Sequence, residues 1–419
     1  MGGDFKMTKQ EKSWIMYDWA NSAYSIAITT AILPVFFKSV AASNLSPATS
    51  TAYWGYTNSF ATLIISILAP ILGAIADYKG YKKKFFSTFL IIGVISTALL
   101  SFVGEGNWIF CSIIYIFSVI GFSGSNIFYD SFLTDVTTEE RMDKVSSLGF
   151  GYGYIGSCIP FIISMVLISK PSLVGLDTIG ATRVAFILTA LWWFVFSIPM
   201  MKHVNQEYYI EPEPHAIRNS FKRLVKTVKH ISKYRSTFLF LISYFFYIDG
   251  VNTIIKMATS YGTDLGLSAS KLMIILLVLQ VVAFPFAIIY GKLAERYSPR
   301  KMILVGIVTY TFISVFGYFM TTELHYWILA FLVGSAQGGI QALSRSYFGK
   351  LIPKENSSEF FGIYNIVGKF SAIFGPLLMG LTTQITGDSR KGVLSLIILF
   401  AIGLLIFLKV DDGEKITTA

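Results

Sequence analysis

The 419-residue chain is 54% hydrophobic, and only 14% of its residues are charged. A soluble domain usually carries about 25% charged residues, so this composition argues against a soluble domain and indicates a membrane protein. The net charge of +10 would suit a nucleic-acid partner, but the basic residues are distributed as membrane topology requires. We therefore expect no nucleic-acid partner.

The apolar residues form segments of roughly 20 residues, the length that crosses the hydrocarbon core as a helix. They do not show the alternating ten-residue strands of a membrane β-barrel. The sequence therefore predicts an all-α integral membrane protein with twelve transmembrane helices. In chain order the predicted spans are about 14–37, 52–76, 85–104, 108–132, 146–169, 183–202, 237–258, 271–291, 302–321, 325–348, 359–384 and 391–409.

The basic residues divide unequally between the two sides of these spans. Of the 34 Lys and Arg residues, 25 fall on the side of the two termini and three lie inside spans. The other six lie on the opposite side: Lys38, Lys170, Arg183, Lys271, Arg390 and Lys391. By the positive-inside rule, both termini of this multi-pass protein are expected in the cytoplasm.

The first predicted span begins with a polar stripe in the sequence YDWANSAYS (17–25). Its polar residues stand at positions i, i+3, i+4 and i+7, which share one helix face: Asp18, Asn21, Ser22 and Ser25. A charge at the bilayer centre costs roughly 2.5–3.5 kcal/mol on insertion scales and usually faces a bundle interior or an aqueous cavity. We expect the stripe to bind substrate or couple its transport. A hydrated position at the membrane interface is the alternative for Asp18.

The loop after the second span, GAIADYKGYKKK (73–84), has a counterpart after the eighth span, GKLAERYSPRKM (291–302). We expect both loops to govern conformation rather than to bind substrate. A glycine permits close helix approach, and a loop carboxylate can cap a helix and pair with basic neighbours in one conformational state only. The residues assigned to this role are Gly73, Asp77, Gly80, Lys82, Lys83, Glu295, Arg300 and Lys301.

The longest hydrophilic stretch separates six spans from six. It divides the chain into an N-terminal half (1–202), a linker (203–236) and a C-terminal half (237–419). The second part of the linker has the apolar spacing of an amphipathic helix, with a basic remaining surface made by Lys222, Arg223, Lys226, Lys229 and Lys233. We expect this helix on the cytoplasmic membrane surface, against anionic lipid. A calmodulin-like partner site is the alternative.

The seventh span repeats the polar stripe of the first, because DGVNTIIKMATS (249–260) aligns with DWANSAYSIAIT (18–29). The stripe consists of Asp249, Asn252, Thr253 and Lys256. We expect these residues to form a cavity wall, with Lys256 attracting a substrate carboxylate and Asp249 an amino group or a coupling proton. The alternative is a structural pair within one helix, although two turns separate the charges by about 10.5 Å of rise.

Spans four and ten carry a second related pair of polar faces. Asn126 and Asp130 on span four align with Gln341 and Arg345 on span ten at an offset of 215 residues. We expect Asp130 and Arg345 to meet across the halves and close an inner gate. Snorkelling to the interface, or pairing within each half, is the alternative.

The remaining candidate substrate residues lie on spans ten and eleven. Gln337 and Gln341 share the helix face of Arg345 and are assigned to substrate binding or coupling. Lys369, in the middle of span eleven, is a second candidate for binding a substrate anion. A buried packing lysine is the alternative for that residue.

Twelve spans in two halves, with a G-x-x-x-D-x-x-G-x-[KR]-[KR] loop after span two, resemble the major facilitator superfamily. Tyr78 and Tyr81 depart from the loop pattern, since basic residues are usual there. Within the superfamily, the chain is similar to the vacuolar amino-acid effluxer family known from yeast autophagy, which has many bacterial relatives. The similar blocks are YDWANSAY (17–24), YDSFLTDVTTEERMDKVSSLGFGYGYIG (129–156), YIDGVNT (247–253) and QALSRSYFGKLIP (341–353). The resemblance implies transport of amino acids or similar solutes out of a compartment.

The sequence contains no ATP-binding, zinc-protease or nucleophile-elbow motif. We therefore expect no enzyme activity and no cofactor. The prediction is a monomeric secondary transporter in a bacterial plasma membrane, working by alternating access on small polar solutes, with protons as candidate coupling ions. The alternatives are a transporter of another organic solute or anion, using Lys256 and Lys369, and an integral-membrane enzyme. A channel is disfavoured because nothing resembles a selectivity filter.

Overall fold

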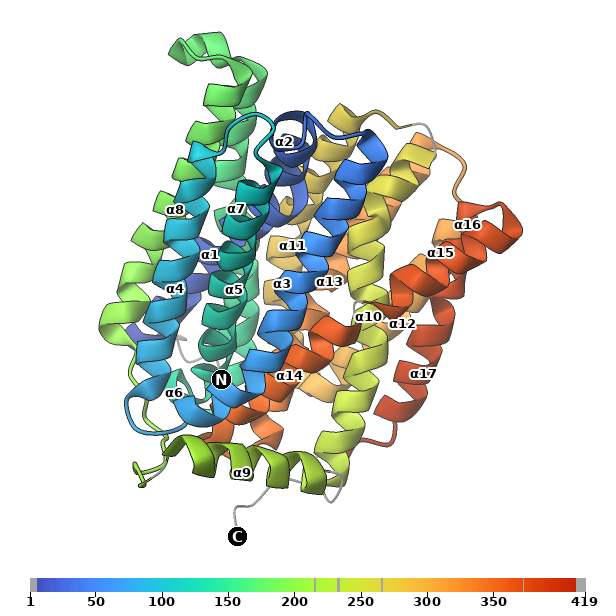
Figure 1. Cartoon of the computed structure of the whole chain (residues 1–419). Coiled ribbons are helices and arrows are strands. Elements are labelled where there is room, and N and C mark those ends of the chain that lie inside the picture. Colours follow the sequence, from blue (N-terminus) through green and yellow to red (C-terminus); the bar gives the residue numbers. More distant parts are fainter. Residues whose placement is uncertain (1–5, 215, 232–233, 265–266, 372, 412–419) are drawn as a thin grey trace.

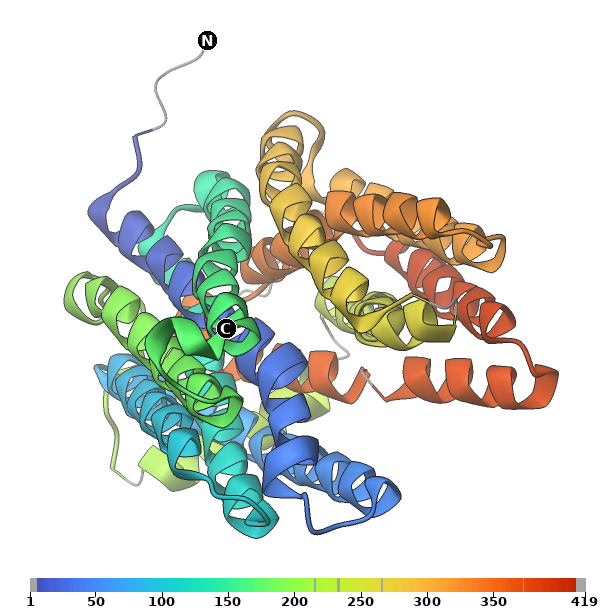
Figure 2. The same cartoon turned by 90° about the horizontal axis from the view of Figure 1, so that it is seen from above.

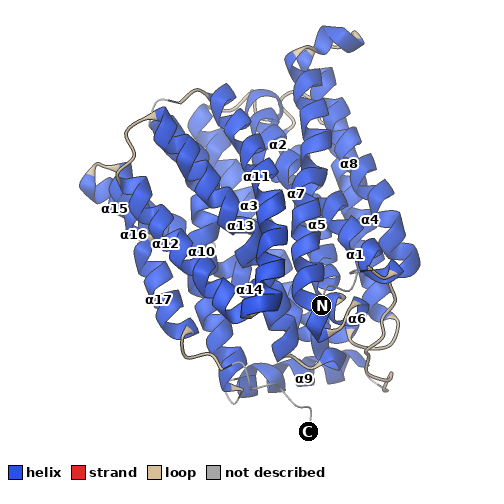
Figure 3. Cartoon of the chain, turned by 180° about the vertical axis from the view of Figure 1, so that it is seen from behind, coloured by secondary structure: helices blue, strands red, loops and turns tan. Residues whose placement is uncertain are grey.

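The computed structural model describes residues 6–214, 216–231, 234–264, 267–371 and 373–411. Figures 1 and 3 show a bundle in which most long helices lie side by side and successive helices are joined at alternating ends. Twelve helical segments in the described ranges are long and apolar enough to cross a membrane. The predicted all-α membrane architecture is thereby confirmed.

The helices of residues 1–203 begin and end as follows: α1 Lys9–Tyr24, η1 Ser25–Ala31, α2 Ile32–Phe36, η2 Phe37–Ala41, α3 Pro47–Ala76, α4 Tyr81–Leu99, η3 Leu100–Phe102, α5 Trp108–Ser131, α6 Leu133–Val136, α7 Glu139–Ser169, η4 Pro171–Val174 and α8 Thr178–His203. The linker helix is α9, Ala216–His230. The later helices are α10 Arg235–Asp264, α11 Ala269–Tyr297, α12 Pro299–Tyr318, α13 Glu323–Leu351, η6 Lys354–Asn356, α14 Ser357–Ser371, α15 Phe374–Thr386, α16 Ser389–Ser395 and α17 Ile397–Phe407.

Helix α1 begins before the apolar segment that marked the first span. Thr8 accepts a hydrogen bond from the Glu11 N–H, and the Glu11 carboxylate accepts one from the Thr8 N–H, which together form a capping box. This early start places Asp18 about 14 Å along the helix. The last residue of the polar stripe, Ser25, begins η1, which is a π-helix, a form often found at functional sites.

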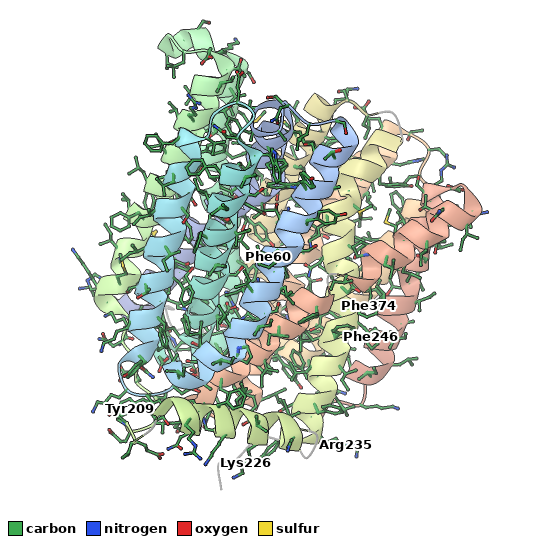
Figure 4. All side chains as sticks on the ribbon, in the orientation of Figure 1. Phe60, Tyr209, Lys226, Arg235, Phe246 and Phe374 are labelled. Carbon is green, nitrogen blue, oxygen red and sulfur yellow. The ribbon has the colours of Figure 1, made fainter. Side chains whose placement is uncertain are left out.

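Two buried hydrophobic clusters support the bundle. One lies within residues 14–204 and the other within residues 240–410. Figure 2 shows the blue-to-green helices on one side and the yellow-to-red helices on the other. Apolar side chains such as Phe60 on α3 and Phe374 on α15 lie on the outside of the bundle, each more than half exposed (Figure 4). Such a surface suits contact with lipid.

Helix α9 lies across one end of the bundle (Figure 1), and we call this end the α9 face. Leu224 is buried, and the Ser220 hydroxyl donates to the Ala74 carbonyl at 3.2 Å. Phe221 and Lys226 are exposed. The amphipathic helix is thus present, whereas its position on a lipid surface stays a prediction. Of its predicted basic residues, Lys233 lies outside the described ranges.

Candidate functional site: a central cavity with an ionic floor

A cavity of about 790 Å³ lies between the two halves of the chain. Both halves contribute polar side chains to its wall, and aromatic and aliphatic residues complete it. A polar cavity in an apolar bundle is where the cost of burying charged groups can be offset by solute and water. The wall includes eight of the eleven predicted substrate or coupling residues: Asp18, Asn21, Ser22, Ser25, Asn252, Lys256, Gln337 and Gln341.

Arg345 closes the cavity toward the α9 face. Its guanidinium donates to Asp130 Oδ1 at 3.2 Å and to Asp18 Oδ2 at 3.3 Å. It also donates to the Ser146 hydroxyl at 3.0 Å and the Ser146 carbonyl at 3.1 Å. The predicted contact between Asp130 and Arg345 is therefore present, and Asp18 joins it. One cation from α13 holds two carboxylates and a backbone carbonyl of the other half.

Aromatic rings enclose the same cation. The guanidinium carbon lies 4.4 Å from the centre of the Phe150 ring and 4.6 Å from that of Trp14, within the range of cation–π attraction. Tyr129 donates to Asp18 Oδ2 at 2.6 Å. A Cβ added at Gly149 would lie 2.6 Å from Asp18 Oδ2, so only glycine leaves room for this network. These ring and glycine contacts were not predicted as parts of the gate.

Asp130 and Arg345 are also the two positions that the sequence comparison of spans four and ten aligns. They stand 215 residues apart, which is the offset of that alignment. The contact joins residues 1–202 to residues 237–419 at the floor of the cavity, so a movement of one part relative to the other must change it.

The polar face of the seventh span is divided between two surroundings. Asn252 and Lys256 line the cavity, while Asp249 and Thr253 are fully buried and point toward Gly375 at the start of α15. Residues four apart on a helix stack over one another, so each pair forms one edge of the predicted stripe. The single wall expected for all four residues is thus limited to Asn252 and Lys256.

The other predicted polar residues make contacts within or between the halves. Gln341 accepts a hydrogen bond from Tyr154 at 3.1 Å. Lys369 lies outside the cavity wall but donates to the Ser123 hydroxyl, a wall group, at 2.7 Å. Lys369 therefore joins α14 to α5 beside the cavity.

The first loop motif forms a contact between the halves at the α9 face. Asp77 accepts the N–H groups of Ser358 at 2.8 Å and Glu359 at 3.1 Å, and so caps α14. A Cβ at Gly73 would lie 2.3 Å from the Ser358 carbonyl oxygen. This close approach explains the glycine, as predicted.

The basic residues of this motif bind the short helix α6, the start of α14 and the linker. Lys82 is fully buried and donates to Asp135 at 2.7 Å and to the Ser357 hydroxyl at 2.9 Å. Lys83 donates to Asn205 of the linker at 3.0 Å. Gly80 has a φ of 77° at the N-cap of α4, a left-handed conformation that favours glycine.

The second loop motif repeats this arrangement loosely. Lys144 pairs with Glu295 at 3.4 Å, across the halves, and a Cβ at Gly291 would lie 2.7 Å from Ser147. Arg300 donates to the Leu408 carbonyl at 2.9 Å within its own half, and Lys301 is exposed at the start of α12. The two loops are therefore related but unequal, with the tighter capping on the Asp77 side.

The linker helix contributes a basic residue to the Asp77 contact. Arg223 donates to Glu359 Oε2 at 2.7 Å and lies 3.7 Å from Asp77 Oδ2, over the Tyr78 ring. It also donates to the Ala74 carbonyl. Burial raises the pKa of the Asp77 carboxyl to about 7, against the opposing charges of Lys82 and Arg223. Arg223 thus turns inward, away from the exposed side of α9 that carries Lys222, Lys226 and Lys229.

The contacts between the halves gather on the α9 side of the cavity. They run from the Asp77 cap through the Arg345 network to Lys369 and Tyr154. The cavity wall continues beyond them to Thr30, Thr62 and Tyr326. The chamber is therefore closed at the α9 face, and its polar wall extends away from that closed end.

This architecture, with twelve spans around a polar chamber between two halves, is that of a membrane transporter of the major facilitator type. Solved structures share the fold. The proton:xylose symporter XylE aligns with a TM-score of 0.71 at 12% identity, covering 96% of this chain and 94% of XylE. FucP in its outward conformation aligns with a TM-score of 0.70 at 14% identity, covering 96% and 98% of the two chains.

The chain belongs to the Atg22-like vacuole effluxer family, whose sequence pattern matches residues 7–419. It is 58% identical to an uncharacterized MFS-type transporter, YxiO, of Bacillus subtilis (strain 168), over 97% of this chain and 96% of that protein. It is 24% identical to autophagy-related protein 22 of Coccidioides immitis (strain RS), over 86% of this chain and 72% of the fungal protein. These relatives confirm the resemblance predicted from the motif blocks.

Proposed function

We propose that this transporter exchanges small zwitterionic solutes, above all amino acids, by alternating access coupled to protons, with efflux as its working direction. The observation that carries the substrate class is the Lys256 side chain on the cavity wall, whose other charged groups, Asp18, Asp130 and Arg345, are paired with one another. A lysine ammonium on such a wall attracts a carboxylate. Gln337 Oε1, without a hydrogen-bond partner among the described residues, is positioned to accept from an ammonium group.

The closed end of the chamber supports an outward-open state under this proposal. The positive-inside rule assigns the α9 face, with its basic loops, to the cytoplasm. The Arg345 network and the Asp77 cap then form the cytoplasmic gate. Closure at this gate leaves the chamber accessible from the other side of the bacterial plasma membrane, and gate opening with closure above the chamber completes the cycle.

An organic anion is the second candidate substrate. Lys369 lies close enough to Lys256 for their charges to interact, and together they offer two cations beside one chamber. A substrate that lacks an ammonium group but carries two carboxylates would suit this arrangement. The two candidates differ in whether an ammonium group is needed for binding.

Thermal unfolding of the purified protein with a panel of solutes tests the substrate class. A ligand at 100 times its Kd adds about 2.7 kcal/mol to the free energy of unfolding, so neutral amino acids are expected to raise the Tm. Lys256→Ala should weaken binding tenfold to a hundredfold, because a charge-assisted hydrogen bond contributes about 1.5–3 kcal/mol. The exposed-lysine variant Lys38→Ala is the matched control. Stabilisation by dicarboxylates alone would favour the second candidate, and a panel without any stabilising solute would contradict both.

A further inference from the structure

Asp249 is a buried carboxylate outside the substrate chamber. It lies near the middle of α10, about 21 Å from the start of that helix, and its side chain is fully buried. Its Oδ2 atom has no hydrogen-bond partner among the described residues. An ionised carboxylate in such surroundings is costly unless it is fully paired. The Oδ2 atom of Asp249 is therefore available to bind a proton.

The remaining contacts of Asp249 come from hydrogen-bond donors. The Thr253 hydroxyl donates to Oδ1 at 3.4 Å, and the Gly375 N–H donates to the carboxylate. A Cβ at Gly375 would lie 2.0 Å from Thr253 Oγ1 and 2.8 Å from Asp249 Oδ1. The first turn of α15 thus approaches α10 as closely as a glycine allows, with its positive dipole end toward the carboxylate.

Asp249 forms no ion pair with a basic side chain in the described part of the chain. Lys256, two turns further along α10, is the charged group that acts on it. The titratable groups that α13 and α14 direct toward α10 lie more than a turn away from Asp249. Tyr347 and Tyr364 contact Phe240 and Tyr244, Tyr326 donates to the Ala258 carbonyl, and Lys369 acts on Lys256. From α17, Phe400 faces Gly250. This isolation distinguishes Asp249 from Asp18, which is bound by Arg345 and Tyr129.

We propose that Asp249, with Thr253 and the Gly375 N–H, forms the proton site that couples transport, separate from the substrate chamber. The inference rests on the proposed function, which requires a proton to be exchanged for solute. A proton from water adds to Oδ2 and converts the carboxylate to a carboxylic acid, and the reverse step returns it. The donors around Asp249 disfavour Na⁺, which needs several oxygen ligands rather than N–H groups.

Protonation of Asp249 changes how strongly its side chain attracts the N-terminus of α15. The ionised carboxylate is attracted to the N-terminus of α15, whereas the neutral acid is held much less strongly. Protonation therefore releases the start of α15 from α10 in the C-terminal half. If the change from outward-open to inward-open needs one protonation state of Asp249 and the return needs the other, proton movement is linked to solute movement.

Proteoliposomes that contain the full-length protein allow proton coupling to be measured separately from solute exchange. The ratio to be measured is pH-gradient-driven accumulation of a labelled amino acid divided by its exchange rate at equal pH. For one proton per solute, a gradient of about one pH unit sustains about tenfold accumulation. Asp249→Asn is expected to reduce accumulation to the undriven level. Asp177→Asn, a carboxylate neutralisation in an exposed helix cap, should leave the ratio unchanged.

The outcomes separate this inference from the proposed function. Wild-type protein without exchange of any amino acid would contradict the proposed function itself. Normal exchange with unreduced driven accumulation in Asp249→Asn, or replacement of the pH gradient by a Na⁺ gradient, would overturn the proton site alone. If Asp249→Asn does not fold, the nearly isosteric Thr253→Val carries the test. It should move the pH of half-maximal driven transport upward by about half a unit, and an unmoved profile would overturn the proposal.

Discussion

Arg345→Gln is expected to open the α9 face in most molecules. The substitution removes the cation shared by Asp18 and Asp130 and leaves two carboxylates facing each other without it. Removing one partner of a buried ion pair costs about 3–5 kcal/mol, which shifts the ratio of open to closed molecules by a hundredfold or more. The cost falls on the closed state because that state brings Arg345 into contact with Asp18 and Asp130.

Electron–electron distances between spin labels measure this opening. Labels at the exposed Lys84 on α4 and Lys301 on α12 report the separation of the halves at the α9 face. We expect one short distance in the wild-type protein and a dominant longer one in Arg345→Gln, with Arg296→Gln at an exposed site as control. Reversing both charges, with Asp130→Arg and Arg345→Asp, should restore closure only in part, because Asp18 would then face a carboxylate. An unchanged distance in Arg345→Gln would contradict the gate.

The closed state of the α9 face is expected to weaken as the pH rises. Burial raises the pKa of Asp77 to about 7 in the closed state, whereas the ordinary value is 3.8. An open state that hydrates this carboxyl restores the lower value, so closure takes up a proton. The preference for closure is complete below about pH 4 and is lost as the pH rises through 7. The closed-to-open ratio should fall by up to on the order of a thousandfold.

The same pair of spin labels, titrated from pH 4 to pH 8, measures this change. Asp77→Asn should greatly reduce the pH dependence of the distance distribution, because the uncharged amide keeps the size of the side chain but cannot titrate. Glu211→Gln, at an exposed position on the same face, should titrate as the wild type does. A wild-type distribution that does not vary with pH would show that Asp77 keeps the same protonation state in both conformations.

Helix number and the floor contact were predictable because they follow from local periodicity and internal repetition. Twenty-residue apolar segments have one stable solution in lipid, so the twelve spans could be counted. The meeting of Asp130 with Arg345 followed from their equivalent depth on spans four and ten. Gly73 was predictable for a similar reason, since a glycine before a loop carboxylate indicates a close helix contact.

The partners of each polar face could not be predicted from one sequence. A helical stripe fixes which residues share a face, but a rotation of a few tens of degrees decides which neighbour that face meets. Asp249 and Thr253 therefore met α15 rather than the chamber, and Asp18 met Arg345. Arg223 resembled its basic neighbours on α9 in every sequence property, yet the end of α3 and start of α14 bind it.

The sequence did contain one usable signal for the ring contacts around Arg345. Tyr129 directly precedes Asp130 in the block YDSFLTD, as Tyr17 precedes Asp18 in YDWANSAY. In the structure Tyr129 donates to Asp18 from the neighbouring span, and Tyr17 donates to Ser125 at 2.8 Å. The tyrosines directly before Asp18 and Asp130 were therefore a sign of cross-helix hydrogen bonding.

Counterflow in proteoliposomes tests alternating-access exchange of amino acids most directly. Vesicles loaded with unlabelled amino acid and diluted into a trace of labelled amino acid, at equal pH on both sides, should accumulate label transiently without any energy source. That overshoot arises only when one chamber carries solute in both directions. Label that merely equilibrates, or enters no faster than into protein-free vesicles, would contradict amino-acid exchange by this protein.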